Sequence, residues 1–390
     1  MSLHHSIIRH LLTAPMSLAD LQLATQVSLP TLRRAVQELS DAHWIRVVGQ
    51  AEANGGRPAM LFGVDDSLFA IVGVHLQLPG IRLILADLNG QVLDARERFD
   101  SAVPTPEEVV QAVAAYVTHI RETQPMRQIL GIGVGAPGFI DLSNGDILSI
   151  GRVPAWGSFP ICRRLQAALA LPVHIANDVD CMAFAEFHAT HAPRGANLAY
   201  VGFDEGVKIS LFLKGELYKG TLGNAGLTAA HLLHIPGLAP SADAARLLTI
   251  NGADQIFAER LATLTPADQM LYGDLLPGSP RERVQQLLTR ADLPLCRALT
   301  EALIAVLAVT LATATLLVQP DVIVIGGLLS ALPDDLFATL EASVRGYLPE
   351  LVSHNTVIQQ GKHGGESNGA LGATHHFLHS YLASVNGELV

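Results

Sequence analysis

Segments with the signatures of β-strands and α-helices alternate along residues 66–390, and this alternation restricts the possible folds more than any other feature. Short apolar runs bounded by turn residues are typical of strands, whereas residues 106–121 carry apolar side chains at helical spacing. The pattern restarts after Arg194-Gly195, which predicts two α/β lobes in tandem. The predicted strands are residues 70–74, 81–86, 129–134, 172–175, 198–201, 208–213, 216–218 and 322–325.

Composition excludes several classes of protein. With 390 residues, 49% of them hydrophobic and 16% charged, the chain has enough apolar material for two or three domains, so global disorder is excluded. The formal net charge of −11 argues against a protein that coats nucleic acid. Cys162, Cys181 and Cys296 are an odd number and lie far apart, which argues against a disulfide framework and indicates a reducing cytoplasm.

One uncharged apolar run, residues 302–318, is long enough to suggest a membrane span. Three threonines interrupt it and Gln319-Pro320 ends it, so we predict a buried helix of an α/β domain and no membrane partner. At the N-terminus, His4, His5 and Arg9 interrupt any apolar segment, so a secretory signal is not expected. The predicted location is the cytoplasm.

Residues 1–65, which we call the head, have the pattern of three helices followed by a hairpin. Ile7, Ile8, Leu11 and Leu12 form a helical apolar stripe. Ser17 with Asp20 resembles a capping box that opens a second helix, and Ser28 with Pro30 opens a third. Residues 44–48 and 59–62 are predicted strands that flank a Gly55-Gly56-Arg57-Pro58 turn.

The third predicted helix of the head has an exposed basic face. Residues 1–64 hold five arginines against four carboxylates, so they are slightly basic although the whole chain carries −11. Arginine can bind guanine and glutamine can bind adenine in the major groove. This order of elements predicts a winged helix-turn-helix that binds DNA; a small helical domain that binds protein is the alternative. The predicted DNA-binding residues are Thr31, Arg33, Arg34 and Gln37 on the helix, and Arg57 in the minor groove.

Five ordered motifs make the body, residues 66–390, similar to the ROK family of repressors and sugar kinases. They are Gly131-Ile-Gly-Val-Gly-Ala-Pro-Gly138, Pro154-Ala-Trp156, Asn177-Asp178, Gly215-Glu-Leu-Tyr-Lys-Gly220 and Pro320-Asp-Val-Ile-Val-Ile-Gly-Gly327. Gly56-Arg57-Pro58 of the head also resembles the family's repressors. The resemblance implies an actin-like (ribonuclease H-like) fold of two lobes, with a sugar cleft between them.

The same resemblance implies a ligand site. Asp178 aligns with the catalytic aspartate of the kinases and Asn177 with a sugar contact, although Asp178 could equally cap the following helix, expected from about Cys181. Gly135 and Ala136 belong to the retained loop. Arg152 stands where the family has an asparagine; it is a candidate contact for an acidic or phosphorylated ligand, or a surface residue in a salt bridge.

Both phosphate loops of the family's kinases are missing. The first kinase loop resembles Asp-x-Gly-Gly-Thr, where this chain has residues 75–79, His-Leu-Gln-Leu-Pro. The second resembles Gly-Thr-Gly-Ile-Gly, where this chain has residues 203–207, Phe-Asp-Glu-Gly-Val. Glycines let backbone N–H groups approach a phosphate, and two carboxylates would repel it. The chain is therefore not expected to be an enzyme.

The family's zinc site is also missing. Its Gly-Glu-x-Gly-His pattern aligns with residues 226–230, which put Leu227 at the glutamate and Ala230 at the histidine. His231 is one position late, and the cysteines expected after it are absent. His231 and His234 alone are a weak metal site, because structural zinc takes four ligands. We expect neither a metal nor a cofactor.

Together these observations predict a transcriptional regulator, a repressor of carbohydrate-related genes, with operator DNA as partner and a sugar or sugar phosphate as a possible effector. The predicted domains are residues 1–65, a winged helix-turn-helix; 66–185, the first lobe, with a C-terminal helix of about 366–390 packed on it; and 186–365, the second lobe, which mediates oligomerisation. A homodimer or homotetramer is expected. The alternatives are an ATP-dependent hexose or N-acetylhexosamine kinase with an appended head, and a scaffold in which neither site works.

Overall fold

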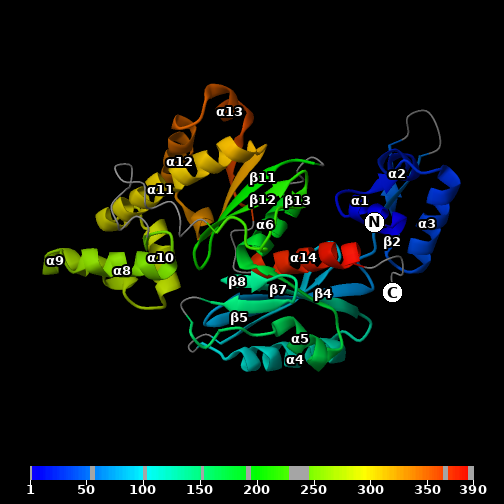
Figure 1. The fold of residues 1–390 in the computed structure, drawn as a ribbon, viewed down its shortest axis with the longest axis horizontal. Helices are drawn as coiled ribbons and strands as arrows, with labels where there is room; N and C mark the ends of the chain where they lie inside the picture. The colour runs from blue at the N-terminus through cyan, green and yellow to red at the C-terminus, as the bar shows by residue number, and fades with distance from the viewer. Residues whose placement is uncertain are drawn as a thin grey trace. The chain divides into compact units, whose positions relative to one another are not determined.

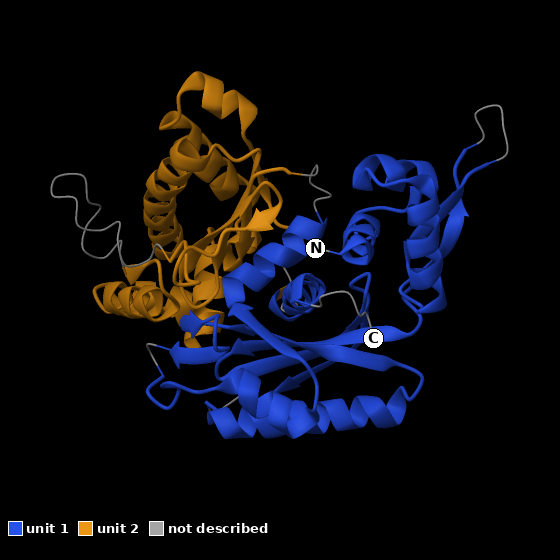
Figure 2. Ribbon diagram, turned by 45° about the vertical axis from the view of Figure 1, so that its right-hand side comes forward, with its two compact units in different colours: residues 1–191, 369–390 blue, residues 192–368 orange. Residues whose placement is uncertain are grey.

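The structure is a computed structural model that describes residues 2–52, 58–99, 103–150, 153–189, 195–227, 246–362 and 368–384. It has the mixed α/β architecture predicted from the sequence (Figure 1). Two compact units make up the chain: unit 1 is residues 1–191 with 369–390, and unit 2 is residues 192–368 (Figure 2). The head lies within unit 1, and the division into three domains stays a prediction.

Three helices and a three-stranded antiparallel sheet form the head. Ser17 and Asp20 make the expected capping box, and the Ser28 side chain caps the third helix. The sequence analysis missed β1, because two residues are too few to carry a periodic signal. The elements are α1 (Leu3–Leu11), β1 (Met16–Ser17), α2 (Leu18–Thr25), α3 (Leu29–Asp41), β2 (Ile45–Gln50) and β3 (Met60–Val64).

A five-stranded sheet, in the order β10-β7-β4-β5-β6, forms the rest of unit 1 together with its helices. β4, β5 and β6 are an antiparallel meander, and β7 and β10 continue the sheet in parallel with β4. α4 and α5 cover one face, and α14 lies on the other (Figure 1). The elements are β4 (Phe69–Gln77), β5 (Gly80–Asp87), β6 (Val92–Arg98), α4 (Pro106–Thr123), β7 (Gln128–Ala136), β8 (Phe139–Asp141), β9 (Asp146–Ser149), α5 (Ile161–Leu169), β10 (Val173–Asn177), α6 (Asp178–Ala189) and α14 (Asn368–Ser384).

Glycines in the sheet let α14 pack directly on the strands. A Cβ atom at Gly73 of β4 would lie 2.2 Å from the Ala370 carbonyl oxygen, and one at Gly133 of β7 would lie 1.9 Å from that of Ala373. Neither position could hold a larger residue without moving the helix. The glycine-rich motif at residues 131–138 therefore has a packing role as well as its place beside the predicted ligand loop.

Unit 2 has a sheet with the same strand order, β13-β12-β11-β14-β15. β11, β12 and β13 are again an antiparallel meander, and β14 and β15 are parallel to β11. The two units therefore repeat one topology, which agrees with the restart of the strand pattern near residue 195. The elements are β11 (Leu198–Phe203), β12 (Val207–Leu213), β13 (Glu216–Leu217), α8 (Ile250–Leu261), α9 (Pro266–Gln269), η1 (Met270–Leu275), α10 (Pro280–Thr289), α11 (Pro294–Val318), β14 (Val322–Gly327), η2 (Leu328–Ala331), α12 (Asp334–Gly346), α13 (Glu350–Asn355) and β15 (Val357–Gln360).

The apolar run 302–318 forms most of α11, which is the one described helix long and apolar enough to cross a membrane. Half of its most apolar window is buried in the structure. Leu303, Leu307 and Leu311 belong to the hydrophobic core of unit 2. The helix therefore packs as a core element within this unit, as the sequence predicted.

The hydrophobic core of the head is continuous with that of the neighbouring sheet. Trp44 is fully buried, with its ring centroid 4.7 Å from that of Phe69 in β4 and 6.5 Å from that of Tyr381 in α14. Ile7 and Leu32 of the head belong to the same cluster of buried side chains. This shared core explains why the head falls within unit 1.

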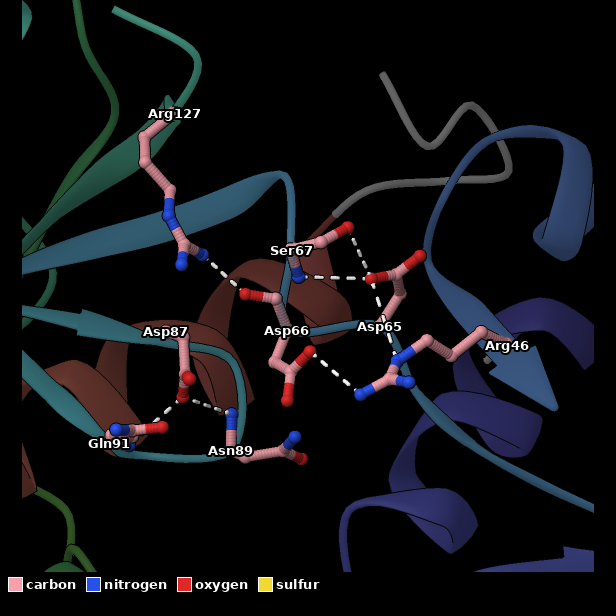
Figure 3. Close-up of polar contacts among 8 residues, drawn as sticks. All are labelled: Arg46, Asp65, Asp66, Ser67, Asp87, Asn89, Gln91 and Arg127. Carbon is pink, nitrogen blue, oxygen red and sulfur yellow. Dashed lines mark hydrogen bonds and ion pairs between the residues drawn. The ribbon is translucent and has the colours of Figure 1, made fainter. Parts of the chain in front are cut away.

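A four-residue connector, residues 65–68, joins β3 to β4 and is held by polar contacts from both sides (Figure 3). Arg46 of β2 forms an ion pair with Asp66, at 3.0 Å between nitrogen and oxygen. Arg127, just before β7, donates a hydrogen bond to the Asp66 carbonyl oxygen. The Ser67 backbone N–H donates to the Asp65 carboxylate at 2.9 Å. These contacts fix the direction in which the chain leaves the head.

Histidines on α6 and α14 predict a dependence of stability on pH. His188 stacks on His375 with ring centroids 4.3 Å apart, and burial, with a smaller contribution from His379, lowers the pKa of His188 to about 4. The unfolded chain therefore binds a proton more readily than the folded one, so the stabilisation is present above about pH 6.5 and is lost as the pH falls toward 4.

We expect the free energy of unfolding to fall by about 2 kcal/mol between pH 7 and pH 5 on account of His188. Urea denaturation of wild type and His188→Phe at both pH values measures it, and the variant should lose less stability on acidification. His354→Gln, at an exposed position of α13, is the control. Equal losses in wild type and His188→Phe would contradict the assignment.

Candidate functional site

Helix α3 presents the predicted DNA-binding residues on its exposed face. Leu32, Ala35, Val36 and Leu39 are buried, and they are the apolar face expected from the helical wheel. The opposite face exposes Thr31, Arg33, Arg34 and Gln37. Three residues, 26–28, separate α2 from α3, and Gln26 takes a left-handed conformation with φ of 55°. A turn of this length between two packed helices is typical of helix-turn-helix motifs.

Two of these exposed side chains are paired along the helix. The Arg34 Nε–H donates to the Glu38 carboxylate at 2.8 Å, and the Gln37 amide donates to the Asp41 carboxylate at 2.8 Å. Sequence analysis missed both acceptors, although their i,i+4 spacing is the signal that reveals such pairs. Within the described part of the chain, Arg33 has no side-chain hydrogen bond or ion pair.

The hairpin after α3 is formed by β2 and β3, which pair from Ile45↔Val64 to Gln50↔Met60 with one irregularity. Gly55 and Gly56, which the sequence analysis assigned to the turn between these strands, lie outside the described residues. Arg57, predicted to enter a minor groove, lies outside the described residues.

In the body, parallel pairing of β7 and β10 brings the predicted ligand residues together within unit 1. Gly135 pairs with Ala176, and Ala136 with Asn177, at the carboxyl ends of both strands. The Asn177 amide lies 3.5 Å from the Ala136 carbonyl oxygen, at the limit of a hydrogen bond. Gly138 has φ of +85°, and a Cβ there would lie 2.2 Å from the Ser149 carbonyl oxygen. The strand ends thus build a tight loop beside Asn177, at the edge where α/β sheets commonly bind ligands.

Asp178 is buried, and it is the first residue of α6. The helix therefore begins three residues before the start predicted near Cys181. The Val179 backbone N–H donates to the Asp178 carboxylate at 2.8 Å and to the Asn177 side-chain oxygen at 3.1 Å. Both side chains thus accept from the same backbone N–H at the helix start, which supports the capping role; the ligand role of Asn177 and Asp178 stays a prediction.

Arg152, the candidate contact for an acidic or phosphorylated ligand, lies outside the described residues. The segment aligned with the zinc motif is described only as far as Leu227, so His231 and His234 also lie outside it.

The segment that the sequence analysis aligned with the first phosphate loop is a closed hairpin. β4 pairs with β5 as far as Gln77↔Gly80, with only Leu78 and Pro79 in the turn. His75 is fully buried, and a Cβ at Gly369 would come within 2.5 Å of its ring. Because the strand backbone is paired and the ring is packed under α14, this hairpin lacks the open glycine loop that a phosphate needs.

The segment that the sequence analysis aligned with the second phosphate loop is held by neighbours in unit 2. The fully buried Asp204 forms an ion pair with Arg281 of α10. The Val207 backbone N–H donates to the Leu248 carbonyl oxygen at 2.9 Å. The two-carboxylate repulsion expected from the sequence is thus partly compensated, because Arg281 neutralises Asp204. The backbone N–H of Val207 is already paired, so it is not available to a phosphate in this structure.

Residues 71–237 and 279–379 match the ROK family, which covers more than half of the chain. The chain therefore belongs to the ROK family, and the resemblance drawn from the five sequence motifs is confirmed.

Among its relatives, the xylose repressor of Bacillus subtilis is 26% identical over 216 residues, which is 55% of each chain. The DNA-binding transcriptional repressor Mlc of Escherichia coli is 25% identical over 354 residues, covering 88% of this chain and 85% of Mlc. The chain spans about half the length of the xylose repressors that it matches.

Solved structures share the fold. A ROK family transcriptional regulator, described as a homolog of the E. coli MLC protein, superposes with a TM-score of 0.75 at 18% identity and covers 97% of this chain and 96% of its own. A ROK family glucokinase from Streptomyces griseus superposes with a TM-score of 0.63 at 21% identity, over 78% of this chain and 98% of its own. At these identities the likenesses show the fold alone.

Proposed function

We propose that this chain is a cytoplasmic DNA-binding transcriptional regulator that represses carbohydrate-related genes. Residues 1–65 would be its winged helix-turn-helix. Two actin-like lobes would follow: residues 66–185 with the C-terminal helix, and residues 186–365, which would mediate assembly into a homodimer or homotetramer. An effector would bind to the body formed by these lobes. The repeated sheet topology supports the two lobes, and the names of the relatives support repression.

The exposed face of α3 is the observation that carries the proposal. Arg33, Arg34 and Gln37 stand on a helix that begins after a three-residue turn and packs on α1 and α2 through its apolar side. Such a helix can lie in the major groove, where arginine and glutamine bind base edges in pairs of hydrogen bonds. Thr31, next to the helix start, would contact phosphate or base, and Arg57 would reach the minor groove.

The body is proposed to bind a sugar or sugar derivative near Gly135, Ala136, Asn177, Asp178 and Arg152. An effector acts only if it binds the DNA-bound and released states with different affinities. A scaffold without an effector is the other role that we consider for the body.

Fluorescence anisotropy of the full chain on a selected operator duplex distinguishes sensor from scaffold. Xylose, glucose and their phosphates are added in turn, and we expect at least one to lower DNA affinity tenfold or more. Asp178→Asn should bind DNA as wild type does but should no longer respond, because its side chain loses one acceptor oxygen and the charge. If no sugar releases the DNA from wild type, the body is a scaffold.

We also propose that the chain is not a kinase, because both segments that would cradle a nucleotide are closed by internal pairs. With Mg-ATP and either glucose or N-acetylmannosamine, phosphate transfer by wild type should not exceed that by Asp178→Asn. Turnover clearly above that of the variant would restore the kinase alternative.

A further inference from the structure

The carboxylate of Glu38 connects α3, the helix proposed to read DNA, with α1, the first helix of the head. One of its oxygens accepts the hydrogen bond from Arg34 Nε at 2.8 Å. The other lies 2.8 Å from His4 Nε2 in α1. Both carboxylate oxygens of Glu38 are therefore held: one by Arg34 of the same helix, and the other by His4 of α1, which lies 34 residues earlier in the chain.

The atom that Arg34 uses for this pair is important for DNA recognition. Arginine binds the guanine edge through two parallel N–H groups. Glu38 occupies Nε, so the two terminal Nη groups keep their donors for a base, and neither has a partner among the described residues. The Arg34 side chain is 83% exposed, so without Glu38 little else would hold it in one orientation.

Glu38 is an unexpected residue on a surface proposed to face DNA. Its side chain is 45% exposed, and the hydrogen bonds from Arg34 and His4 lower the pKa of the carboxyl group, so it carries a negative charge at neutral pH. A negative charge near phosphates weakens binding to every sequence alike. A carboxylate in this place therefore needs a role that compensates for the repulsion.

We propose that Glu38 is a positioning residue for sequence recognition, which holds Arg34 through Nε in the orientation that reads a guanine, and that His4 anchors Glu38. The inference rests on the proposed function, since it concerns how the same helix discriminates between sequences. Glu38 would thus raise selectivity while it lowers affinity for DNA in general.

The test measures the affinity of the full chain for a selected duplex and for a scrambled duplex of equal length, and takes their ratio. Glu38→Ala should lower the ratio by about tenfold, since one bidentate base contact is misplaced, and should strengthen binding to the scrambled duplex. Glu38→Gln keeps an acceptor oxygen for the Arg34 Nε–H but removes the negative charge. It should therefore strengthen binding to the scrambled duplex, while the ratio of the two affinities stays close to that of wild type. His4→Ala should lower the ratio by a smaller factor than Glu38→Ala.

A double-mutant cycle separates positioning from a general effect of charge. In an Arg34→Ala background, Glu38→Ala should cause no further fall in the ratio, because the side chain that it positions is gone. Glu52→Gln, which removes the same charge from an exposed position of the head, should leave the ratio unchanged. Circular dichroism checks that the variants are folded.

Three outcomes overturn the inference. The ratio is unchanged in Glu38→Ala, or it falls equally with and without Arg34, or Glu38→Gln behaves as Glu38→Ala does. In each of these the wild type still selects its sequence, so the proposed function stands. If the wild type selects no duplex at all, the proposed function and this inference are both overturned.

Discussion

Replacing both arginines of α3, as Arg33→Ala/Arg34→Ala, should weaken binding to a selected operator duplex by at least about 100-fold. Each bidentate contact to a base discriminates by about 1–3 kcal/mol, and each lost phosphate contact lowers affinity for all sequences. Both side chains are exposed on the face opposite the buried Leu32 and Val36, so their removal should leave the head folded.

Anisotropy titrations at several salt concentrations measure this effect. The slope of log affinity against log salt should become less steep by about one for each phosphate contact that is lost. Arg163→Ala/Arg164→Ala is a matched control, since these are also adjacent arginines, half or more exposed, on α5 of the same unit. If the α3 variant and the control bind equally, α3 is not the DNA-binding helix.

Trp44→Ala should lower the free energy of unfolding by about 3–5 kcal/mol, the usual cost of removing a buried aromatic side chain. Trp44 is fully buried between Phe69 and Tyr381, so the cavity would open between the head, the sheet and α14. We therefore expect the sheet of unit 1 to lose stability along with the head.

The two tryptophans allow this coupling to be measured directly. In Trp44→Ala the remaining tryptophan is Trp156, which is buried in the core beneath α4 and donates to the Pro104 carbonyl oxygen at 2.8 Å. Its fluorescence in urea should report a transition at lower denaturant than in Trp44→Phe, which keeps an aromatic ring. A Trp156 transition at the same midpoint in both variants would mean that the head unfolds independently.

Local features of the head could be predicted from the sequence because they depend on residues close together in the chain. The capping box at Ser17 and Asp20, the cap at Ser28 and the buried face of α3 are all set within one or two helical turns. The alternation of strands and helices likewise predicted the class of fold. The apolar runs also predicted the strands β7 and β10, but not that the two strands pair in parallel.

Contacts between distant segments could not be predicted in this way. Asp204 and Arg281 are far apart in the sequence, and nothing near either residue indicates that they pair. The same holds for Trp44 and Tyr381, which join the head to the C-terminal helix. His4 and Glu38 also come together only because α1 packs on α3. Such pairs depend on how elements pack, which periodicity does not encode.

Selection of bound duplexes from a pool of random DNA by the full-length chain is the most direct test that this protein is a sequence-specific regulator. We expect successive rounds to enrich one motif with two related half-sites in inverted orientation, because the proposed symmetric homo-oligomer would place two copies of α3 on the duplex. Arg33→Ala/Arg34→Ala should enrich nothing. A wild-type selection that also ends with no enriched motif would contradict the proposed function.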